Sequence, residues 1–374
     1  MEFFKTSAVL ALALSALAAS AAPEGDRSHV ADFAGKKIPL TMRDSVAGKT
    51  TNVTFKEAKP KELIFTDSDA GGELAIPSDT TSFRFAYGKL DDLGRSFHAL
   101  NRGEAELALA GMRGYVYPAL GLLVLPESSF YQLNETLDRF VSLLLKQGMI
   151  KEATALVKAM PLGRANVPAQ VNAMEIGKAM VAAGDVKGAV EVLNRIPLTE
   201  EYAEIYPSVL DFAAAIRKTT INDDIQRFYA QLGNSQSNPL KTACTLWAIY
   251  CEISRGSLTS AKLSLGTMKD SFKPSDREFP LYKMVDGLRA VKENKYAEAL
   301  DLFAEGIVFA QPSDPCLPEL LYNIGKAYKH EKNLTASNEI FKQISLLYPG
   351  DPIAPAALKE VVKIEEEKSG AAQD

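Results

Sequence analysis

The sequence contains few of the residues that form disulfide bonds or bind metal ions, with three cysteines and three histidines in 374 residues, and it has one tryptophan. Cys244 and Cys251 lie seven residues apart in a helical pattern. At about 1.5 Å rise per residue their Cα atoms are roughly 10 Å apart, beyond disulfide reach. We expect both to pack as small buried hydrophobes, and Cys316 to lie in a loop where it could be a free thiol. A disulfide framework is therefore excluded.

Motifs that carry catalysis are also missing. The histidines form no H-x-x-x-H or H-E-x-x-H pattern for zinc, and no G-x-S-x-G nucleophile elbow occurs. Gly48-Lys49-Thr50 looks like the end of a phosphate-binding loop, but Arg43 stands where that motif needs its first glycine. We expect a β-turn with Gly48 at positive φ, and no enzyme activity, metal or cofactor.

The charge and the hydrophobic runs exclude two further classes. A net charge of −5 argues against nucleic acid as a ligand. After residue 21 we find no apolar run long enough to span a bilayer, so no transmembrane segment is expected in the mature chain.

Residues 1–21 have the three parts of a secretory signal peptide. Lys5 supplies the positive charge, and Ala8–Ala18 forms a short apolar core. Small residues precede a cut that we expect after Ala21. An uncleaved membrane anchor is the alternative, but the apolar core is short for a bilayer. The sequence predicts export to the periplasm or outside the cell, with residues 22–33 disordered.

Residues 34–88 contain short segments in which apolar and polar residues alternate, as in the strands of a small β module. We expect five strands at Lys37–Met42, Thr51–Phe55, Glu62–Phe65, Glu73–Ile76 and Phe83–Tyr87. This number of short strands fits an SH3-like or Lsm-like barrel, or a curled sheet. About 50 residues form a marginal core alone, so the module should pack against the first helices.

From residue 89 to 363 the pattern is helical, and turns recur at a nearly constant interval. Successive turns are separated by 36, 36, 36, 38 and 38 residues; they lie at Gly148, Gly184, Thr220, Gly256, Asn294 and Lys332. A small residue follows five positions after each turn, except after Thr220, where Ile225 stands. An earlier turn at Gly103 leaves room for an irregular segment at Tyr117–Ser129. An interval of about 36 residues is typical of stacked two-helix repeats.

The last hairpin, Leu320–Pro349, resembles the tetratricopeptide-repeat family. Its small, bulky and helix-ending positions follow that family's spacing, at Ile324, Gly325, Tyr328, Ser337, Phe341 and Pro349. Gly177 and Gly287 occupy the position of Gly325 in their repeats, where a glycine permits close helix packing. The resemblance is looser in the middle of the chain, where Pro161 and Pro197 end second helices early.

This resemblance implies a mainly α fold: an α-solenoid of helical hairpins after the β module, capped by a helix at Ala354–Lys363. We expect residues 364–374 to be a disordered tail. The β module and its position also resemble exported envelope proteins of Verrucomicrobia and Planctomycetes. The shared pattern is a strand, a Gly-Gly turn, a strand ending in Ile76-Pro77 and then Phe83-x-Phe85, followed by helical repeats. In those proteins a small β module precedes a tetratricopeptide array.

In the tetratricopeptide family the first helices of the hairpins line a concave groove that binds peptides. The resemblance implies that Tyr322, Asn323, Lys326 and Lys329 face this groove, where they would suit an extended peptide or an acidic tail. An ordinary solvated face is the alternative. The preceding repeat does not supply the lysines and asparagines of the family's carboxylate clamp, because it has Met284, Val285 and Leu288 there.

We therefore predict a non-catalytic exported scaffold or adaptor that binds a protein or peptide partner through the groove. One alternative is a structural subunit of an envelope or secretion assembly. Another is a cell-wall or glycan hydrolase with a site in the β module near His98, although the sequence offers no nucleophile–base pair for it.

Overall fold

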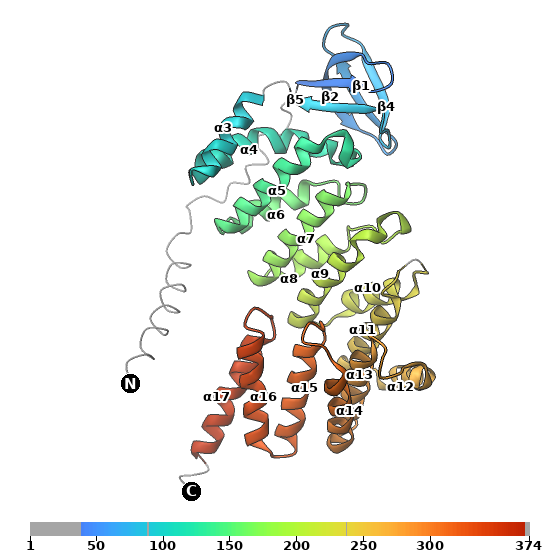
Figure 1. The fold of residues 1–374 in the computed structure, drawn as a ribbon, viewed down its shortest axis with the longest axis vertical. Coiled ribbons are helices and arrows are strands. Elements are labelled where there is room, and N and C mark those ends of the chain that lie inside the picture. The colour runs from blue at the N-terminus through green and yellow to red at the C-terminus, as the bar shows by residue number, and fades with distance from the viewer. Residues whose placement is uncertain (1–38, 88–89, 237, 371–374) are drawn as a thin grey trace.

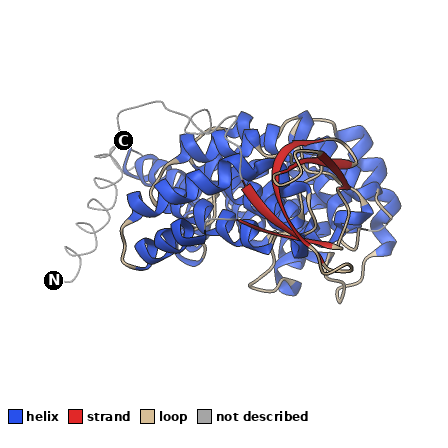
Figure 2. Ribbon diagram, turned by 90° about the horizontal axis from the view of Figure 1, so that it is seen from above, coloured by secondary structure: helices blue, strands red, loops and turns tan. Residues whose placement is uncertain are grey.

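The computed structural model describes residues 39–87, 90–236 and 238–370. The predicted signal peptide, the predicted disordered stretch at 22–33, the start of the β module and the last four residues lie outside these ranges. Within them, a small sheet stands at one end of an elongated array of helices (Figure 1 and Figure 2). The predicted order of a β module followed by helical hairpins is confirmed.

The sheet contains the five predicted strands, with some ends shifted. They are β1 (Pro39–Asp44), β2 (Thr50–Ala58), β3 (Glu62–Asp67), β4 (Glu73–Pro77) and β5 (Phe83–Tyr87). All neighbours are antiparallel in the order β4-β3-β2-β1-β5, and no pairing joins β4 to β5 among the described residues. Gly48 has a φ of 67° in the turn before β2, as predicted. The sheet is therefore an open ladder, and an SH3-like classification stays a prediction.

The β module packs directly on the helices, as its small size predicts. The ring centroid of Phe85 lies 6.3 Å from that of Phe130, just before the third helix. The ring of Phe55 covers Gly121, where an added Cβ would lie 2.7 Å from the ring. Aromatic contacts thus join the sheet and the first helices into one hydrophobic core.

The helices form successive antiparallel pairs along the array (Figure 1). They are α3 (Leu90–Asn101), α4 (Ala105–Ala119), α5 (Tyr131–Lys146), α6 (Ile150–Ala159), α7 (Val167–Ala182), α8 (Val186–Leu193), α9 (Tyr206–Thr219), α10 (Asp223–Asn234), α11 (Lys241–Ser254), α12 (Leu258–Met268), α13 (Phe279–Lys292), α14 (Tyr296–Phe309), α15 (Leu317–His330), α16 (Leu334–Leu347) and α17 (Ala354–Gly370). Short 3-10 turns lie at η1 (Leu120–Val124), η2 (Glu127–Ser129), η3 (Glu200–Ile205) and η4 (Lys269–Ser271). The predicted irregular segment thus corresponds to the end of α4, η1 and η2.

A residue with positive φ turns the chain within six of the pairs. These residues are Gly103, Gly148, Gly184, Gly256, Asn294 and Lys332. The predicted turn at Thr220 differs: Thr220 has φ −149° and ψ 143°, and the link 220–222 is extended. A β-branched residue takes a positive φ only at high cost, so this link cannot fold α10 back in the same way.

The extended link separates two packing units. α9 packs against α7 and α8, and α10 packs closely against α11, whereas α9 meets α10 mainly through a buried bond between Arg217 and Tyr229. The array is therefore interrupted between α9 and α10, at the repeat where Ile225 replaces the usual small residue.

Two predictions about apolar and terminal segments are corrected. Ala105–Val124, in α4 and η1, is long and apolar enough to span a membrane. However, 61% of it is buried inside the protein, and Arg113 within it pairs with Glu152, so it is a core helix. At the C-terminus, α17 runs to Gly370 and Ile364 is fully buried, so the predicted tail is helical over its first part.

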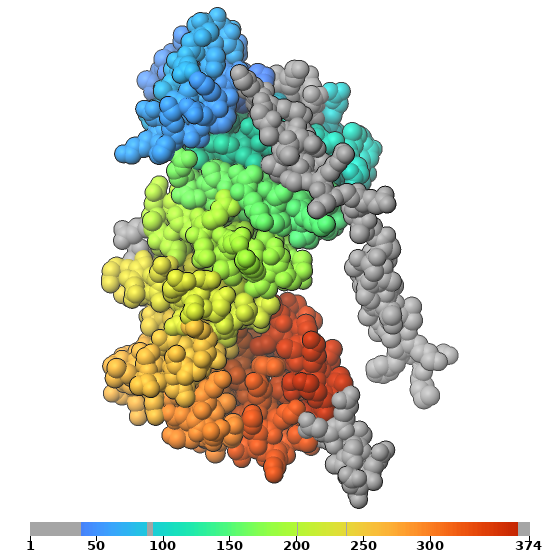
Figure 3. All heavy atoms as spheres, turned by 180° about the vertical axis from the view of Figure 1, so that it is seen from behind, coloured from blue at the N-terminus to red at the C-terminus, as the bar shows by residue number. Residues whose placement is uncertain are grey.

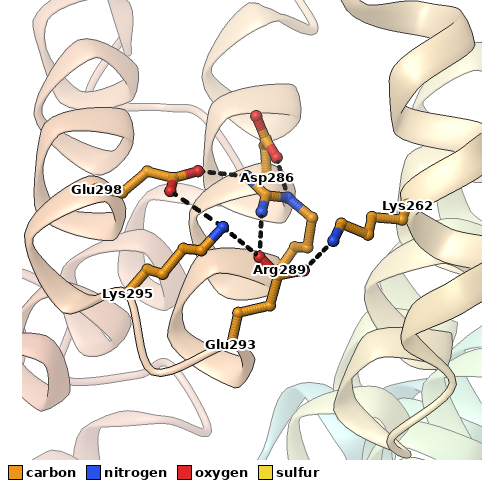
Figure 4. Close-up of polar contacts among 6 residues, drawn as sticks. All are labelled: Lys262, Asp286, Arg289, Glu293, Lys295 and Glu298. Carbon is orange, nitrogen blue, oxygen red and sulfur yellow. Dashed lines mark hydrogen bonds and ion pairs between the residues drawn. The ribbon is translucent and has the colours of Figure 1, made fainter.

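A charged network ties α12 to α13 and α14 (Figure 4). The Glu293 carboxylate lies 2.6 Å from the Lys262 ammonium, 3.0 Å from that of Lys295 and 2.8 Å from the Arg289 guanidinium. Arg289 also bonds the carboxylates of Asp286 and Glu298. The hydrogen bonds from Lys262 and Lys295 lower the pKa of Glu293 to about 2.

Candidate functional site

The four residues predicted to face a groove do not line one open surface. Asn323 is only 8% exposed, and its side-chain amide donates to a backbone carbonyl one turn earlier. Tyr322 is half-buried, with its ring centroid 5.5 Å from that of Phe341. Lys326 is exposed, with its ammonium 5.8 Å from the Tyr322 ring centroid.

The fourth residue, Lys329, is engaged by the capping helix. Its ammonium lies 3.1 Å from the Glu360 carboxylate of α17, and both side chains are mostly buried. The cap therefore occupies part of the face that the sequence analysis assigned to a partner. Whether these residues bind a partner stays a prediction.

A buried ion pair lies inside the array, between α9 and α15. Arg217 of α9 and Glu319 of α15 are each 2% exposed, and the Arg217 Nη1 lies 2.8 and 2.6 Å from the two Glu319 oxygens. These residues are 102 positions apart in the chain. α9 thus reaches across the repeats between them and contacts the start of α15.

Aromatic side chains hold Arg217 in place. Its guanidinium carbon lies 3.4 Å from the ring centroid of Trp247, and its Nε donates to the Tyr229 hydroxyl at 3.3 Å. Burial opposes the charge of Arg217, but Glu319 outweighs it, so the pKa of the guanidinium stays above its ordinary value. Burial also raises the pKa of Tyr229. The pair is therefore charged, with a neutral aromatic shell.

A second ion pair lies one residue further along α9. The Lys218 ammonium lies 2.6 Å from the Asp351 carboxylate, in the turn between α16 and α17, and these side chains are 10% and 14% exposed. The C-terminal helices consequently abut the middle of the array, where the red and yellow-green surfaces meet in Figure 3.

A cavity of about 520 Å³ lies beside these ion pairs. One wall is the face of α9 that carries Leu210 and Ala214, and the opposite side is formed by Trp247 and Leu281. The rim includes the exposed residues Arg277 and Ser313. Its volume falls in the range of about 300–1,000 Å³ that is usual for ligand pockets.

Three helices begin at this cavity. Leu240, Glu278 and Cys316 precede α11, α13 and α15, all three line the cavity, and none of them caps its helix with a side-chain hydrogen bond. The first-turn N–H groups of a helix carry partial positive charge. However, Pro280 and Pro318 in the first turns of α13 and α15 have no N–H, and the N–H groups of Phe279 and Leu317 already donate to backbone carbonyls. The cavity therefore offers mainly apolar walls, which suit the apolar side chains of a peptide segment.

The three cysteines are free and buried. Cys244 and Cys251 pack in α11 as expected, whereas Cys316 is only 5% exposed at the cavity wall. Burial raises the pKa of Cys251 and of Cys316 to about 12. A thiol in that state is a poor nucleophile at neutral pH. In the described part of the chain, no three His, Cys, Asp or Glu residues gather as they would to hold a metal ion.

Sequence reasoning missed Arg217 and Glu319. Arg217 continues the buried stripe of α9 that includes Val209, Phe212 and Ile216. A charged residue on an apolar stripe is the signal that could have identified it, because buried charges need a partner. The partner itself could not be found from a pattern, since it lies three repeats away.

The comparisons with known proteins add the following. No protein-family model and no curated protein matches the chain. Among solved structures, the chain is similar to a tetratricopeptide repeat protein from Parabacteroides merdae, with a TM-score of 0.42 and 13% identity. The match covers 73% of this chain and 98% of that one. The hairpins described above make this chain a helical-repeat protein with an N-terminal antiparallel sheet.

Proposed function

We propose that this protein is a non-catalytic scaffold that holds a segment of another protein in the cavity between α9 and the first turns of α11, α13 and α15. The observation that carries the proposal is the cavity itself, with apolar walls at Leu210, Trp247 and Leu281. One or two bulky apolar side chains of a peptide would fill it.

The cellular location of the scaffold is part of the same proposal. Residues 1–21 have the composition of a cleaved export signal, so we infer that the scaffold works in the periplasm or outside the cell. The partner is then an exported or envelope protein.

Site-specific crosslinking tests the cavity. A photoreactive phenylalanine analogue at Ser313, on the exposed rim, should give a discrete adduct in envelope extract, and the same group at exposed Lys187 on α8 should not. Ala214→Trp, which fills the cavity, should abolish the Ser313 adduct. Equal adducts at both positions, or a Ser313 adduct that survives Ala214→Trp, would contradict the proposal. A Tyr322→Ala, Lys326→Glu variant tests the α15 surface in parallel.

A second candidate function, a structural subunit of an envelope assembly, is favoured by exposed apolar residues. Val308-Phe309 on α14 and Leu346-Leu347 on α16 stand at the same place in two successive repeats, and their side chains are 42–78% exposed. Repeat-equivalent positions lie side by side in a solenoid, and an exposed apolar patch marks an interface. Mass measured by size-exclusion chromatography at several concentrations separates a subunit that self-assembles from a monomeric scaffold.

A further inference from the structure

The wall of the cavity formed by α9 belongs to a different packing unit from the rest of the cavity. α9 packs on α7 and α8, and past the link 220–222 it meets α10 mainly through the bond from Arg217 to the Tyr229 hydroxyl. The opposite side of the cavity is built by α11, α13 and the loop before α15. The two sides are therefore joined in the chain by the short link 220–222, which is extended at Thr220 and Asn222.

Charged contacts join the two sides in space. Arg217 and Lys218, at the end of α9, bond Glu319 and Asp351, which follow the link by about a hundred residues or more. The cavity itself lies beside these bonds, so it separates much of α9 from the facing helices.

An ion pair is suited to a contact that has to open. Desolvation offsets much of the attraction in a buried pair, and both charges regain water when they separate. Apolar surface, by contrast, loses its full burial energy on exposure. Closure through Arg217–Glu319 and Lys218–Asp351 is specific in geometry, and opening costs the stacking of Arg217 on Trp247 in addition to the two pairs.

We propose that α9 is a movable wall, that residues 220–222 are its hinge, and that the two ion pairs are the latch that holds the cavity closed. In the closed state Arg217 and its aromatic shell, Tyr229 and Trp247, line the cavity. Opening widens the cavity and admits a partner segment. The role of the partner rests on the proposed function, whereas the latch and the hinge do not.

Spin-label distances across the cavity test the latch without a partner. Labels at Asp211→Cys and Ser313→Cys report the width, and the three native thiols are buried. The labelled protein with both ion pairs intact should give one narrow distribution of label-to-label distances. Lys218→Asp, which places two carboxylates together, should add a longer component, and the charge swap Lys218→Asp with Asp351→Lys should remove it again.

Two controls complete the experiment. Labels at Lys151→Cys and Lys187→Cys, both within the N-terminal unit, should give the same distance in every variant. If Lys218→Asp fails to fold, Asp351→Asn replaces it as the variant without the Lys218–Asp351 pair. It should also lengthen the distance between the labels at Asp211→Cys and Ser313→Cys. Fluorescence of Trp247, the single tryptophan, should change with opening because its ring faces Arg217.

The proposal is overturned by an unchanged cavity distance in folded Lys218→Asp or Asp351→Asn protein, or by a swap variant as open as the single variant. Because no partner is present, these outcomes are independent of the crosslinking result. A latch that opens as expected, with no adduct at Ser313, would reject the proposed binding function alone.

Discussion

The ring of Phe341 occupies the space above Gly325, so that a Cβ added to Gly325 would lie 2.7 Å from the ring. Gly287 stands in the same relation to Phe303 one repeat earlier. Glycine at this position lets the two helices of a hairpin approach closely, and the aromatic ring fills the gap. The ring over Gly177 comes from Phe212 of the next repeat.

Gly325→Ala should destabilise the protein. Alanine improves helix propensity by about 1 kcal/mol, but overpacking a buried ring costs about 1–3 kcal/mol, so we expect a net loss of up to about 2 kcal/mol in urea unfolding. Gly266→Ala is the matched control, because Gly266 lies in α12 with no atom near its Cβ position. It should gain up to about 1 kcal/mol. Equal effects of the two changes would contradict the close-packing role.

Removing one member of the Arg217–Glu319 pair should be costly. Glu319→Ala leaves a buried, unpaired guanidinium, and we expect a loss of about 3–5 kcal/mol in the free energy of unfolding. The double change Arg217→Met, Glu319→Leu removes both charges and should be more stable than the single variant. A double variant as unstable as Glu319→Ala would show that packing, rather than the lone charge, causes the loss.

Acid should weaken the network around Glu293. The folded pKa of Glu293, about 2, lies below the ordinary value of 4.5. Its contribution to stability is therefore complete above about pH 4.5, and it is lost as the pH falls from there towards about 2. Urea unfolding between pH 6 and 3 should show a shallower loss of stability in Glu293→Gln than in the parent. Glu339→Gln, an exposed change on α16, should keep the parent slope.

The β module should unfold together with the first helices. Phe85 is 6% exposed and contacts Phe130, so Phe85→Ala should cost about 3–5 kcal/mol. Hydrogen exchange should show loss of protection in β2 and α5 alike. Val46→Ala, at a position 85% exposed, should change stability by less than about 0.5 kcal/mol. Loss of protection in the strands alone would make the module an independent unit.

Signal cleavage can be checked by intact mass. The exported form should begin at Ala22, and Ala21→Arg should block processing while Ala22→Ser permits it. An envelope form that retains residue 1, or a chain confined to the cytoplasm, would contradict the export prediction.

The sequence predicted local features well and distant ones poorly. Alternating residues such as Phe83 and Phe85 identify strands, and a recurring turn residue followed five positions later by a small residue identifies hairpins, because both signals act within a few residues. The cavity could not be predicted, because it forms where Arg217 meets Glu319, and these residues come together only through the packing of the three repeats between them. Asn323 is predicted to face a groove, but it is buried and its amide donates to the Glu319 carbonyl of its own helix.

The contact between α9 and α15 also bears on how the chain folds. In an ordinary solenoid each repeat touches only its neighbours, so stability grows by nearest-neighbour increments and repeats can fray one at a time. Here a non-neighbouring pair closes a loop of 102 residues, which slows the final step and couples everything between its ends. The segment from α9 to α15 should accordingly fold late and cooperatively, while the repeats before it form early.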